Sequence, residues 1–208
     1  MDMNIESYRK LKEEYEEIRM ARNFGLRILM ARLKNLKDES TANGQEGLFM
    51  RITSRLKDFD SALQKCEDRG RPLSVEGLRT LDDIAGVRII TRYKDGIYAV
   101  RELIEKQPSV SIWRPDDDFV DTPRATGYRA LHVNVDVEVC LPEETIQVPV
   151  EIQIRTPGMD FWAETEHGLR YKNGHPCPEA HAFFTQLSES LAKIDGTMMA
   201  MRDWDVEK

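Results

Sequence analysis

The sequence predicts an α+β protein in which a mixed β-sheet is flanked by helices, with a long helix at each end of the chain. Strict alternation of apolar and polar residues over 146–155 is typical of a β-strand. Apolar residues that recur every three or four positions over 4–37 and over 184–201 predict amphipathic helices. Because helices and strands follow one another without internal repeats, we expect one layered α+β unit.

The length of 208 residues fits a single domain, since domains have about 150 residues as a rough guide. Hydrophobic residues make up 40% of the chain, which is enough to bury a core. Within this domain we distinguish an N-terminal helical extension (1–40), a core (50–175) and a C-terminal helix (179–203).

Charge and cysteine content limit the classes of function. The net charge of −7 disfavours a general nucleic-acid-binding surface, although it leaves room for a local basic pocket. Three distant cysteines without a CxxC motif are typical of a reducing cytosol and argue against structural zinc. The chain has neither the apolar start of a signal peptide nor a run of about 18 apolar residues, so we expect a cytoplasmic protein that does not span a membrane. The cysteines are Cys66, Cys140 and Cys177.

The first third of the chain is expected to be mainly helical. The helix over 4–37 is followed by a polar loop at 38–47, a second helix at 54–65 and a second loop at 66–77. In the first helix the apolar spacing is interrupted and then resumes after Gly25. A docked amphipathic helix is the simplest interpretation of this segment.

The middle of the chain alternates between strand and helix. We expect a strand at 87–91, a helix at 95–106 and a short strand at 110–113. Residues 114–127 then form a long loop without periodicity, and loops of this length are usually functional or disordered.

A β-hairpin is expected where 133–139 and 146–155 flank the turn LPEE. One face of the second strand carries a carboxylate, an amide and a guanidinium, although a polar face that merely meets water is the alternative. Pro149 has no N–H for the ladder, so it should lie at a sheet edge or beside a bulge. The apolar face is Ile146, Val148, Val150, Ile152 and Ile154, and the polar face is Gln147, Pro149, Glu151, Gln153 and Arg155.

The C-terminal helix carries a narrow apolar seam that resembles one strand of a coiled coil. Such a seam needs a partner helix, which either the N-terminal helix or another subunit could supply. We therefore expect this helix to serve in oligomerisation. The seam residues are Phe184, Leu187, Leu191, Ile194, Met198 and Met201.

An acidic side chain at one strand start and another on a second strand could share a divalent cation. Asp82 and Asp83 lead into one strand, where Gly86 permits close backbone approach, and Glu151 lies on the other. Hard cations prefer such oxygen ligands, so Asp83 and Glu151 form a candidate pair. A helix cap or a turn is the alternative role for Asp82 and Asp83.

Two further groups could bind nucleotides. Arg55, Lys57 and Lys65 could hold polyphosphate, with Lys57 and Lys65 on one helical face, or could form a solvated basic surface. The segment PRATGYRALH combines an aromatic ring with cations, as in sites that grip a nucleobase and its phosphates, unless its tyrosine only packs a loop end. Its candidate residues are Arg124, Tyr128, Arg129 and His132.

Taken together, four ordered segments resemble the synthetase domain of the RelA/SpoT-homologue family, and most closely its small alarmone synthetases of the RelQ type. The resemblance covers about residues 50–175, which would be the catalytic core with a nucleotidyltransferase-like synthetase fold. The segments are RLKDFDSALQK (55–65), LDDIAGVRII (81–90), GYRALH (127–132), and VEIQIRT with MDFWAETEHGLRYK (150–172).

The resemblance implies a GTP/GDP pyrophosphokinase. This family transfers the β,γ-pyrophosphoryl group of ATP to the 3′-hydroxyl of GDP or GTP, uses magnesium, and yields (p)ppGpp and AMP. ATP and GDP or GTP would then be the substrates and Mg²⁺ the cofactor. The small members are often tetramers, so a homotetramer is the implied assembly.

The resemblance also implies roles for individual residues. Arg55, Lys57 and Lys65 match the cations of the ATP site. Asp83 and Glu151 match the magnesium ligands, and Glu151 would also orient the 3′-hydroxyl or accept its proton. On the acceptor side the matched positions are Tyr128, which would stack on guanine, and His132 and Arg124 near the phosphates. Gln153 and Arg155 belong to the same signature in supporting roles, and Arg129 is a further candidate donor to GDP or GTP from the same segment as Tyr128.

Two other functions compete with this one. The same chemistry could act on the 3′ end of tRNA, but the acidic net charge and the intact GYRALH segment do not indicate RNA binding. A module that binds nucleotide or RNA without catalysis would have no need for both Asp83 and Glu151.

Overall fold

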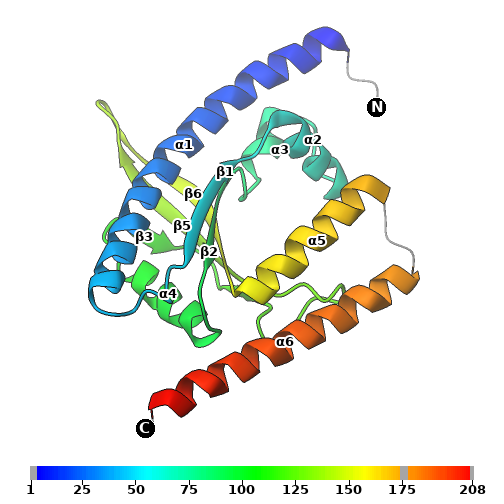
Figure 1. Ribbon diagram of the computed structural model, residues 1–208. Helices are drawn as coiled ribbons and strands as arrows, with labels where there is room; N and C mark the ends of the chain where they lie inside the picture. The colour runs from blue at the N-terminus through cyan, green and yellow to red at the C-terminus, as the bar shows by residue number, and fades with distance from the viewer. Residues whose placement is uncertain (1–3, 174–177, 207–208) are drawn as a thin grey trace.

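A mixed β-sheet forms the centre of the molecule, as Figure 1 shows. The computed structural model describes residues 4–173 and 178–206. The strands are β1 (Arg51–Leu56), β2 (Ala85–Ile90), β3 (Val110–Ile112), β4 (Asp117–Asp118), β5 (Leu131–Cys140) and β6 (Thr145–Arg155). Their order is β1-β2-β6-β5-β3, and β4 pairs with β5 beside this path. Among the strands of the described residues only β2 and β6 pair in parallel, so the predicted mixed sheet is confirmed.

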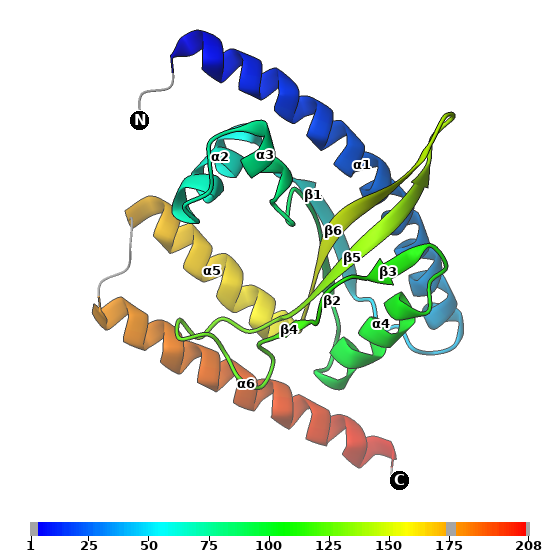
Figure 2. The same ribbon diagram turned by 180° about the vertical axis from the view of Figure 1, so that it is seen from behind.

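Helices flank this sheet on both sides. They are α1 (Ile5–Ala42), α2 (Phe59–Asp68), α3 (Val75–Arg79), α4 (Asp95–Glu105), α5 (Pro157–Asn173) and α6 (Pro178–Val206). The long helix α1 crosses the sheet and contacts β1, β2, β5 and β6. Figures 1 and 2 both place α1 and α6 on opposite sides of the molecule. The α+β class with long terminal helices is therefore confirmed.

Helix α1 belongs to two hydrophobic cores, so the predicted N-terminal extension is an integral part of the fold. Its second half packs on the sheet, and its first half packs against α2 and α3. At Gly25 a Cβ atom would lie 2.6 Å from Val148 Cγ1, so only glycine lets the helix approach the hairpin this closely. The buried α1 residues that belong to these hydrophobic cores are Leu26, Leu29, Leu33 and Leu36 in the sheet core, and Leu11, Tyr15 and Ile18 in the other.

The predicted hairpin is formed by β5 and β6. Val150, Ile152 and Ile154 are buried, and Asn134 lies opposite Glu151 on the other face. Pairing of β6 with β2 begins only at Glu151. Pro149 therefore lies where β6 has a neighbouring strand on one side only, which confirms its predicted edge position.

The predicted helix over 54–65 is wrong in its first part. Ser54–Leu56 belongs to β1, an edge strand whose polar side chains are exposed, so no buried apolar face distinguishes it as a strand. The helix α2 begins only at Phe59, because Asp58 caps it by accepting a hydrogen bond from Ser61 N at 2.8 Å. Helix α1 likewise continues to Ala42, into the predicted loop at 38–47.

The C-terminal helix finds its intrachain neighbour in α5, not in α1. The two helices contact each other directly, and Trp162 Nε1 donates to Phe184 O at 2.7 Å. The C-terminal end of the seam is exposed, with Ile194 56%, Met198 49% and Met201 56% accessible. The N-terminal helix is therefore not the partner of the seam, and the exposed end of the seam can contact another subunit.

Two further expectations can be compared with the described residues. Cys66 is buried and Cys140 exposed, both as free thiols, whereas Cys177 and the end of the predicted core at 174–175 lie outside those residues. None of the helices in 4–173 and 178–206 has an apolar stretch long enough to cross a membrane.

Candidate active site

The polar face of the sheet forms a hollow between β1 and β6. Arg55, Gly86 and Glu151 occupy adjacent positions on β1, β2 and β6. Because Gly86 has no side chain, a cavity of about 150 Å³ remains between Arg55 and Glu151. Its other lining residues include Thr53, Arg88 and Gln153. The hollow thus has cations on one side and a carboxylate on the other.

Asp83 gathers the three predicted ATP-site cations at one end of this hollow. Its Oδ2 atom lies 2.5 Å from Lys65 Nζ, 3.1 Å from Lys57 Nζ and 3.9 Å from an Arg55 guanidinium nitrogen. Burial opposes ionisation of Asp83, but the hydrogen bond from Lys65 and the nearby lysine charges outweigh it, so its pKa lies below the ordinary value. The sequence therefore predicted a real cluster, although Lys57 precedes α2 and does not share a helical face with Lys65.

The two predicted metal ligands face the same site. The Arg55 guanidinium, which lies 3.9 Å from Asp83 Oδ2, belongs to a residue that lines the same cavity as Glu151. Asp83 Oδ1 is buried and has no hydrogen-bond partner among the described residues. No group of three or more His, Cys, Asp or Glu suited to a metal occurs in that part of the chain. Two carboxylates still fit Mg²⁺, which usually keeps waters and substrate phosphates as its other ligands.

Glu151 is joined to Tyr128 through His132. Glu151 Oε1 lies 3.3 Å from His132 Nδ1, and His132 Nε2 lies 2.6 Å from the Tyr128 hydroxyl. The contacts are satisfied when the hydroxyl donates to Nε2 and Nδ1–H donates to the carboxylate. His132 therefore lies between the candidate stacking residue and the candidate catalytic residue.

A second path runs through the polar face of β6. Gln153 Nε2 donates to Glu151 Oε2 at 2.8 Å, and Arg155 donates to Gln153 Oε1 at 2.7 Å. Arg155 also donates to the Tyr128 hydroxyl at 2.9 Å, which closes a ring of five side chains. Burial would raise the pKa of Glu151, but the hydrogen bonds from His132 and Gln153 and the nearby positive charge lower it to about 2. Glu151 is therefore ionised at neutral pH.

Tyr128 lies in an aromatic corner. Its ring meets those of Phe119 and Trp162 edge-on, with centroids 6.3 and 6.2 Å away. The Arg124 guanidinium lies 4.3 Å from the Phe119 centroid and 5.4 Å from that of Tyr128. Sequence reasoning missed Phe119, because it stands in the loop at 114–127 without a periodic pattern.

Arg129 lies apart from the other candidate residues. Its guanidinium donates to Val120 O at 2.6 Å, to Asp121 O at 3.2 Å and to Ser188 Oγ at 3.1 Å. In this structure Arg129 therefore ties the loop to α6. Its contact with an acceptor nucleotide stays a prediction.

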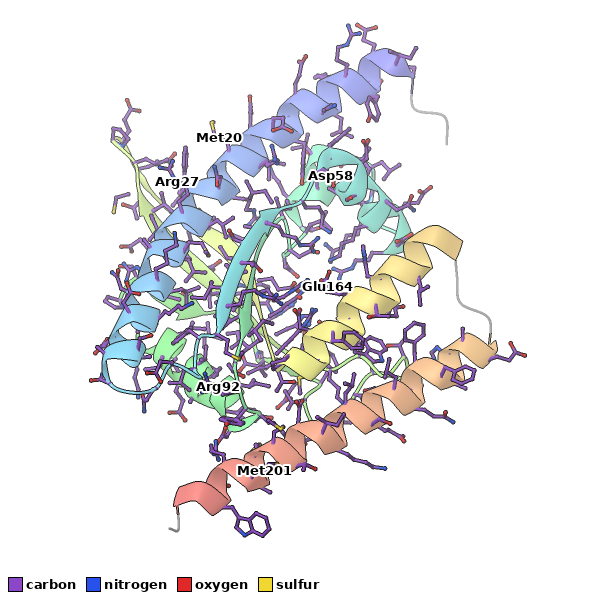
Figure 3. The ribbon with its side chains drawn as sticks, in the orientation of Figure 1. Met20, Arg27, Asp58, Arg92, Glu164 and Met201 are labelled. Carbon is purple, nitrogen blue, oxygen red and sulfur yellow. The ribbon has the colours of Figure 1, made fainter. Side chains whose placement is uncertain are left out.

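A second, open cavity of about 670 Å³ lies between the β1–β2 edge and α5. It adjoins the first, since Thr53 and Arg88 line both. Arg88 pairs with Glu164, which points from α5 into the space beside the sheet in Figure 3. Arg88 was missed by sequence reasoning, although an arginine within the apolar run of β2 is a usable signal.

The chain is similar to known proteins over much of its length. Residues 54–176 match the model of the region found in RelA/SpoT proteins. The chain is 30% identical over 183 residues to the GTP pyrophosphokinase YwaC of Bacillus subtilis, covering 86% of this chain and 87% of that protein. It is 33% identical over 156 residues to the GTP pyrophosphokinase YjbM of the same organism, covering 73% and 71%.

Solved structures agree with this assignment. The small alarmone synthetase 1 of Bacillus subtilis, bound to its product pppGpp, superposes with a TM-score of 0.85 at 27% identity, covering 92% of this chain and 97% of that one. The small alarmone synthetase 2 of that organism gives a TM-score of 0.81 at 29% identity, covering 91% and 98%. With the family model matching more than half of its length, the chain belongs to the RelA/SpoT family.

Proposed function

We propose that this chain is a GTP pyrophosphokinase that makes (p)ppGpp. It transfers the β,γ-pyrophosphoryl group of ATP to the 3′-hydroxyl of GDP or GTP and releases AMP. The relatives named GTP pyrophosphokinases and the synthetase solved with pppGpp support this activity. The observation that carries the proposal is the cluster of Asp83 with three cations beside the cavity that Arg55 and Glu151 line.

The cations Arg55, Lys57 and Lys65 bind the phosphates of ATP. Two unit charges about 4 Å apart interact by about 4 kcal/mol at an effective dielectric constant of 20, so two nucleotides cannot share a site without such compensation. Arg55 lines the hollow, and Lys57 and Lys65 already converge on Asp83. Phosphate oxygens that enter the hollow therefore meet cations that the fold has placed beforehand.

Tyr128 stacks on the guanine of the acceptor. Stacking needs a flat face in a fixed place, and the contacts with Phe119 and Trp162 hold the ring edge-on. Arg124, above these rings, supplies positive charge for the acceptor phosphates. His132, Gln153 and Arg155 link this half of the site to Glu151.

Glu151 orients the 3′-hydroxyl for attack. The 3′-oxygen bonds to the β-phosphorus of ATP, the bond from that phosphorus to the α,β-bridging oxygen breaks, and AMP leaves. The hydroxyl proton passes to the Glu151 carboxylate late in this step, because a carboxylate with a lowered pKa is a weak base. Positioning thus contributes more than base strength.

Asp83 and Glu151 are the residues that would hold Mg²⁺. When bound, this cofactor would neutralise part of the phosphate charge. The buried Asp83 Oδ1, which has no hydrogen-bond partner among the described residues, supports this assignment.

The activity is tested by product analysis. Purified protein is incubated with ATP, GDP and Mg²⁺, and the nucleotides are separated and identified by mass spectrometry. We expect AMP and guanosine bearing a 3′-pyrophosphate. Label transferred from ATP to mixed tRNA instead, or guanine nucleotide binding without AMP release, would reject the proposal in favour of the RNA-directed or the non-catalytic alternative.

We also propose that the exposed end of α6 binds a second copy of the chain. Four large apolar side chains on its last turns are about half or more exposed, which is unusual for a surface without a partner. A homotetramer remains the assembly expected from the small members of the family. We call the four exposed residues Ile194, Met198, Met201 and Trp204 the α6 row.

A further inference from the structure

Helix α6 holds the segment that carries Tyr128. Ser188 on this helix is only 3% exposed. Its hydroxyl donates to Gly127 O at 2.6 Å and accepts from Arg129 Nε at 3.1 Å. Ser188 therefore binds the residues directly before and after Tyr128, and both hydrogen-bonding capacities of its hydroxyl are used.

The contact between this segment and α6 is tight. Gly127 has a φ of +92°, and a Cβ atom there would lie 3.1 Å from Ser188 Cβ and 3.2 Å from Phe184 O. Only about 10 Å³ of free space remains beside the contact, which is at the lower limit for one water molecule. The segment therefore cannot move closer to the helix, and Ser188 keeps it from moving away.

Two other contacts extend this support. At one end His181 Nε2 lies 3.1 Å from Ala125 O, three residues before Tyr128. At the other end Asp195 accepts a hydrogen bond of 2.5 Å from Thr156 Oγ1, directly after Arg155. Helix α6 thus contacts residues before and after Tyr128 and the residue directly after Arg155.

We propose that Ser188 is a positioning residue for the acceptor nucleotide. It fixes the Gly127 carbonyl before Tyr128 and the Arg129 side chain after it. It thereby sets the position of the ring that stacks on guanine and of the hydroxyl that joins the ring of side chains around Glu151. Ser188 lies outside residues 54–176, the part that matches the family model. The inference rests on the proposed function, since it assigns guanine to Tyr128.

The test compares Ser188→Ala with Ser190→Ala. Ser190 is exposed on the same helix and donates only to Gln186 O of its own turn, so it is a matched control. Loss of one buried hydrogen-bonding group typically changes an equilibrium by about tenfold. We expect Ser188→Ala to raise the KM for GDP and the dissociation constant for GDP by about that factor, with the KM for ATP unchanged. Ser190→Ala should match the parent protein.

A second variant guards against misfolding of Ser188→Ala. His181→Ala removes an exposed side chain from the other end of the contact and should raise the KM for GDP a few-fold without changing that for ATP. An unchanged KM for GDP in folded Ser188→Ala, or equal rises in the KM for GDP and ATP, would overturn the proposal. If Ser188→Ala does not fold, an unchanged KM for GDP in His181→Ala would overturn the proposal.

Calorimetric binding of GDP without ATP separates this inference from the proposed function. If the parent protein binds GDP but releases no AMP, the proposed activity fails, whereas the effect of Ser188→Ala on GDP affinity still decides the role of Ser188. If the parent releases AMP and Ser188→Ala binds GDP normally, only the role of Ser188 fails.

Discussion

Tyr128 and Glu151 are joined by hydrogen bonds along two separate paths. One path runs through His132, and the other runs through Arg155 and Gln153. The side chain expected to bind the acceptor base and the one expected to act on its ribose are therefore held as a unit. A closed polar ring of this kind is rigid because each member is fixed from two sides.

The Tyr128 hydroxyl should affect the rate more than the binding of the acceptor. Tyr128→Phe keeps the stacking face but opens the ring at His132 and Arg155. We expect kcat to fall about tenfold, the effect of one buried hydrogen-bonding group, with little change in the KM for GDP. Steady-state kinetics with varied GDP measure both quantities.

Tyr128→Ala should act differently, because it also removes the stacking face. Base–aromatic stacking contributes about 1–3 kcal/mol per base, so the KM for GDP should rise about 5-fold to 150-fold.

Tyr98→Phe is the matched control for Tyr128→Phe, since the Tyr98 hydroxyl donates to Asp118 at an exposed position. Equal effects of Tyr128→Phe and Tyr98→Phe would show that the ring does not support catalysis.

Asp83 should stabilise the fold as well as the site. It is the shared partner of Lys57, Lys65 and Arg55, and its own side chain is 6% exposed. Removing one partner from a buried charge cluster typically costs about 3–5 kcal/mol. Asp83→Asn should therefore lower the free energy of unfolding in urea by about 3 kcal/mol.

The neighbouring residue provides the control for that experiment. Asp82 pairs with Arg114 at 3.1 Å and is more exposed, with 24% of its side chain accessible. Asp82→Asn should cost at most about 1 kcal/mol, as for other exposed ion pairs. Similar losses in the two variants would contradict the cluster as the source of the stability.

The lowered pKa of Glu151 predicts how stability depends on pH. Its pKa falls from 4.5 to about 2 on folding, so its ionised form stabilises the native state above the ordinary pKa. This contribution is lost as the pH falls through the folded value. Relative to Glu151→Gln, the parent protein should lose free energy of unfolding between pH 4.5 and about 2. Urea titrations across this range measure the difference. A free energy of unfolding that rises on acidification in the parent relative to Glu151→Gln would contradict the prediction.

The α6 row should control assembly. Met201 is 56% exposed, so Met201→Glu places a charge in the proposed interface without disturbing the contact with α5. Light scattering should show a smaller mass for this variant than for the parent. Leu191 is less suitable as a probe, because its Cβ atom lies near Gly158 of α5.

Gly196→Glu is the control for charge. Gly196 is exposed on the same helix, and a Cβ atom there would have no neighbour within 4 Å. By the 3.6-residue period it lies about 80° or more around the helix from every residue of the α6 row. Its mass should equal that of the parent. The same mass for Met201→Glu and the parent would count against the α6 row as the interface.

Much of the fold could be predicted where a repeating pattern meets a buried face. The alternation in β6 predicted that Val150 and Ile152 lie in the core and that Glu151 and Gln153 lie on the polar face. This register is well defined, because a shift of one residue would bury the Glu151 carboxylate. The pattern of β1 failed as a guide, because an edge strand that lines a polar hollow has no buried apolar face to mark it.

The site was predictable residue by residue but not in its connections. The resemblance of the sequence segments identified Asp83, Glu151 and Tyr128 as candidates. The ring of hydrogen bonds that joins Tyr128 to Glu151, however, depends on the register between β5 and β6 and on the direction of the Arg155 side chain. Ser188 carried no signal, since a serine within a helix is common and its partners lie some 60 residues earlier in the chain, at separations of 61 and 59 residues. Long-range pairing of this kind is visible only in three dimensions.

The central claim is that Glu151 acts on the 3′-hydroxyl, whereas the folding of the protein and the binding of the two nucleotides do not require its carboxylate. Its most direct test is single-turnover transfer from ATP to bound GDP in the parent protein and in Glu151→Gln, with GDP affinity measured in parallel. We predict that transfer slows about 1,000-fold, within the range of catalytic proton-transfer groups, while GDP affinity is unchanged. Transfer at the parental rate in Glu151→Gln would contradict the account.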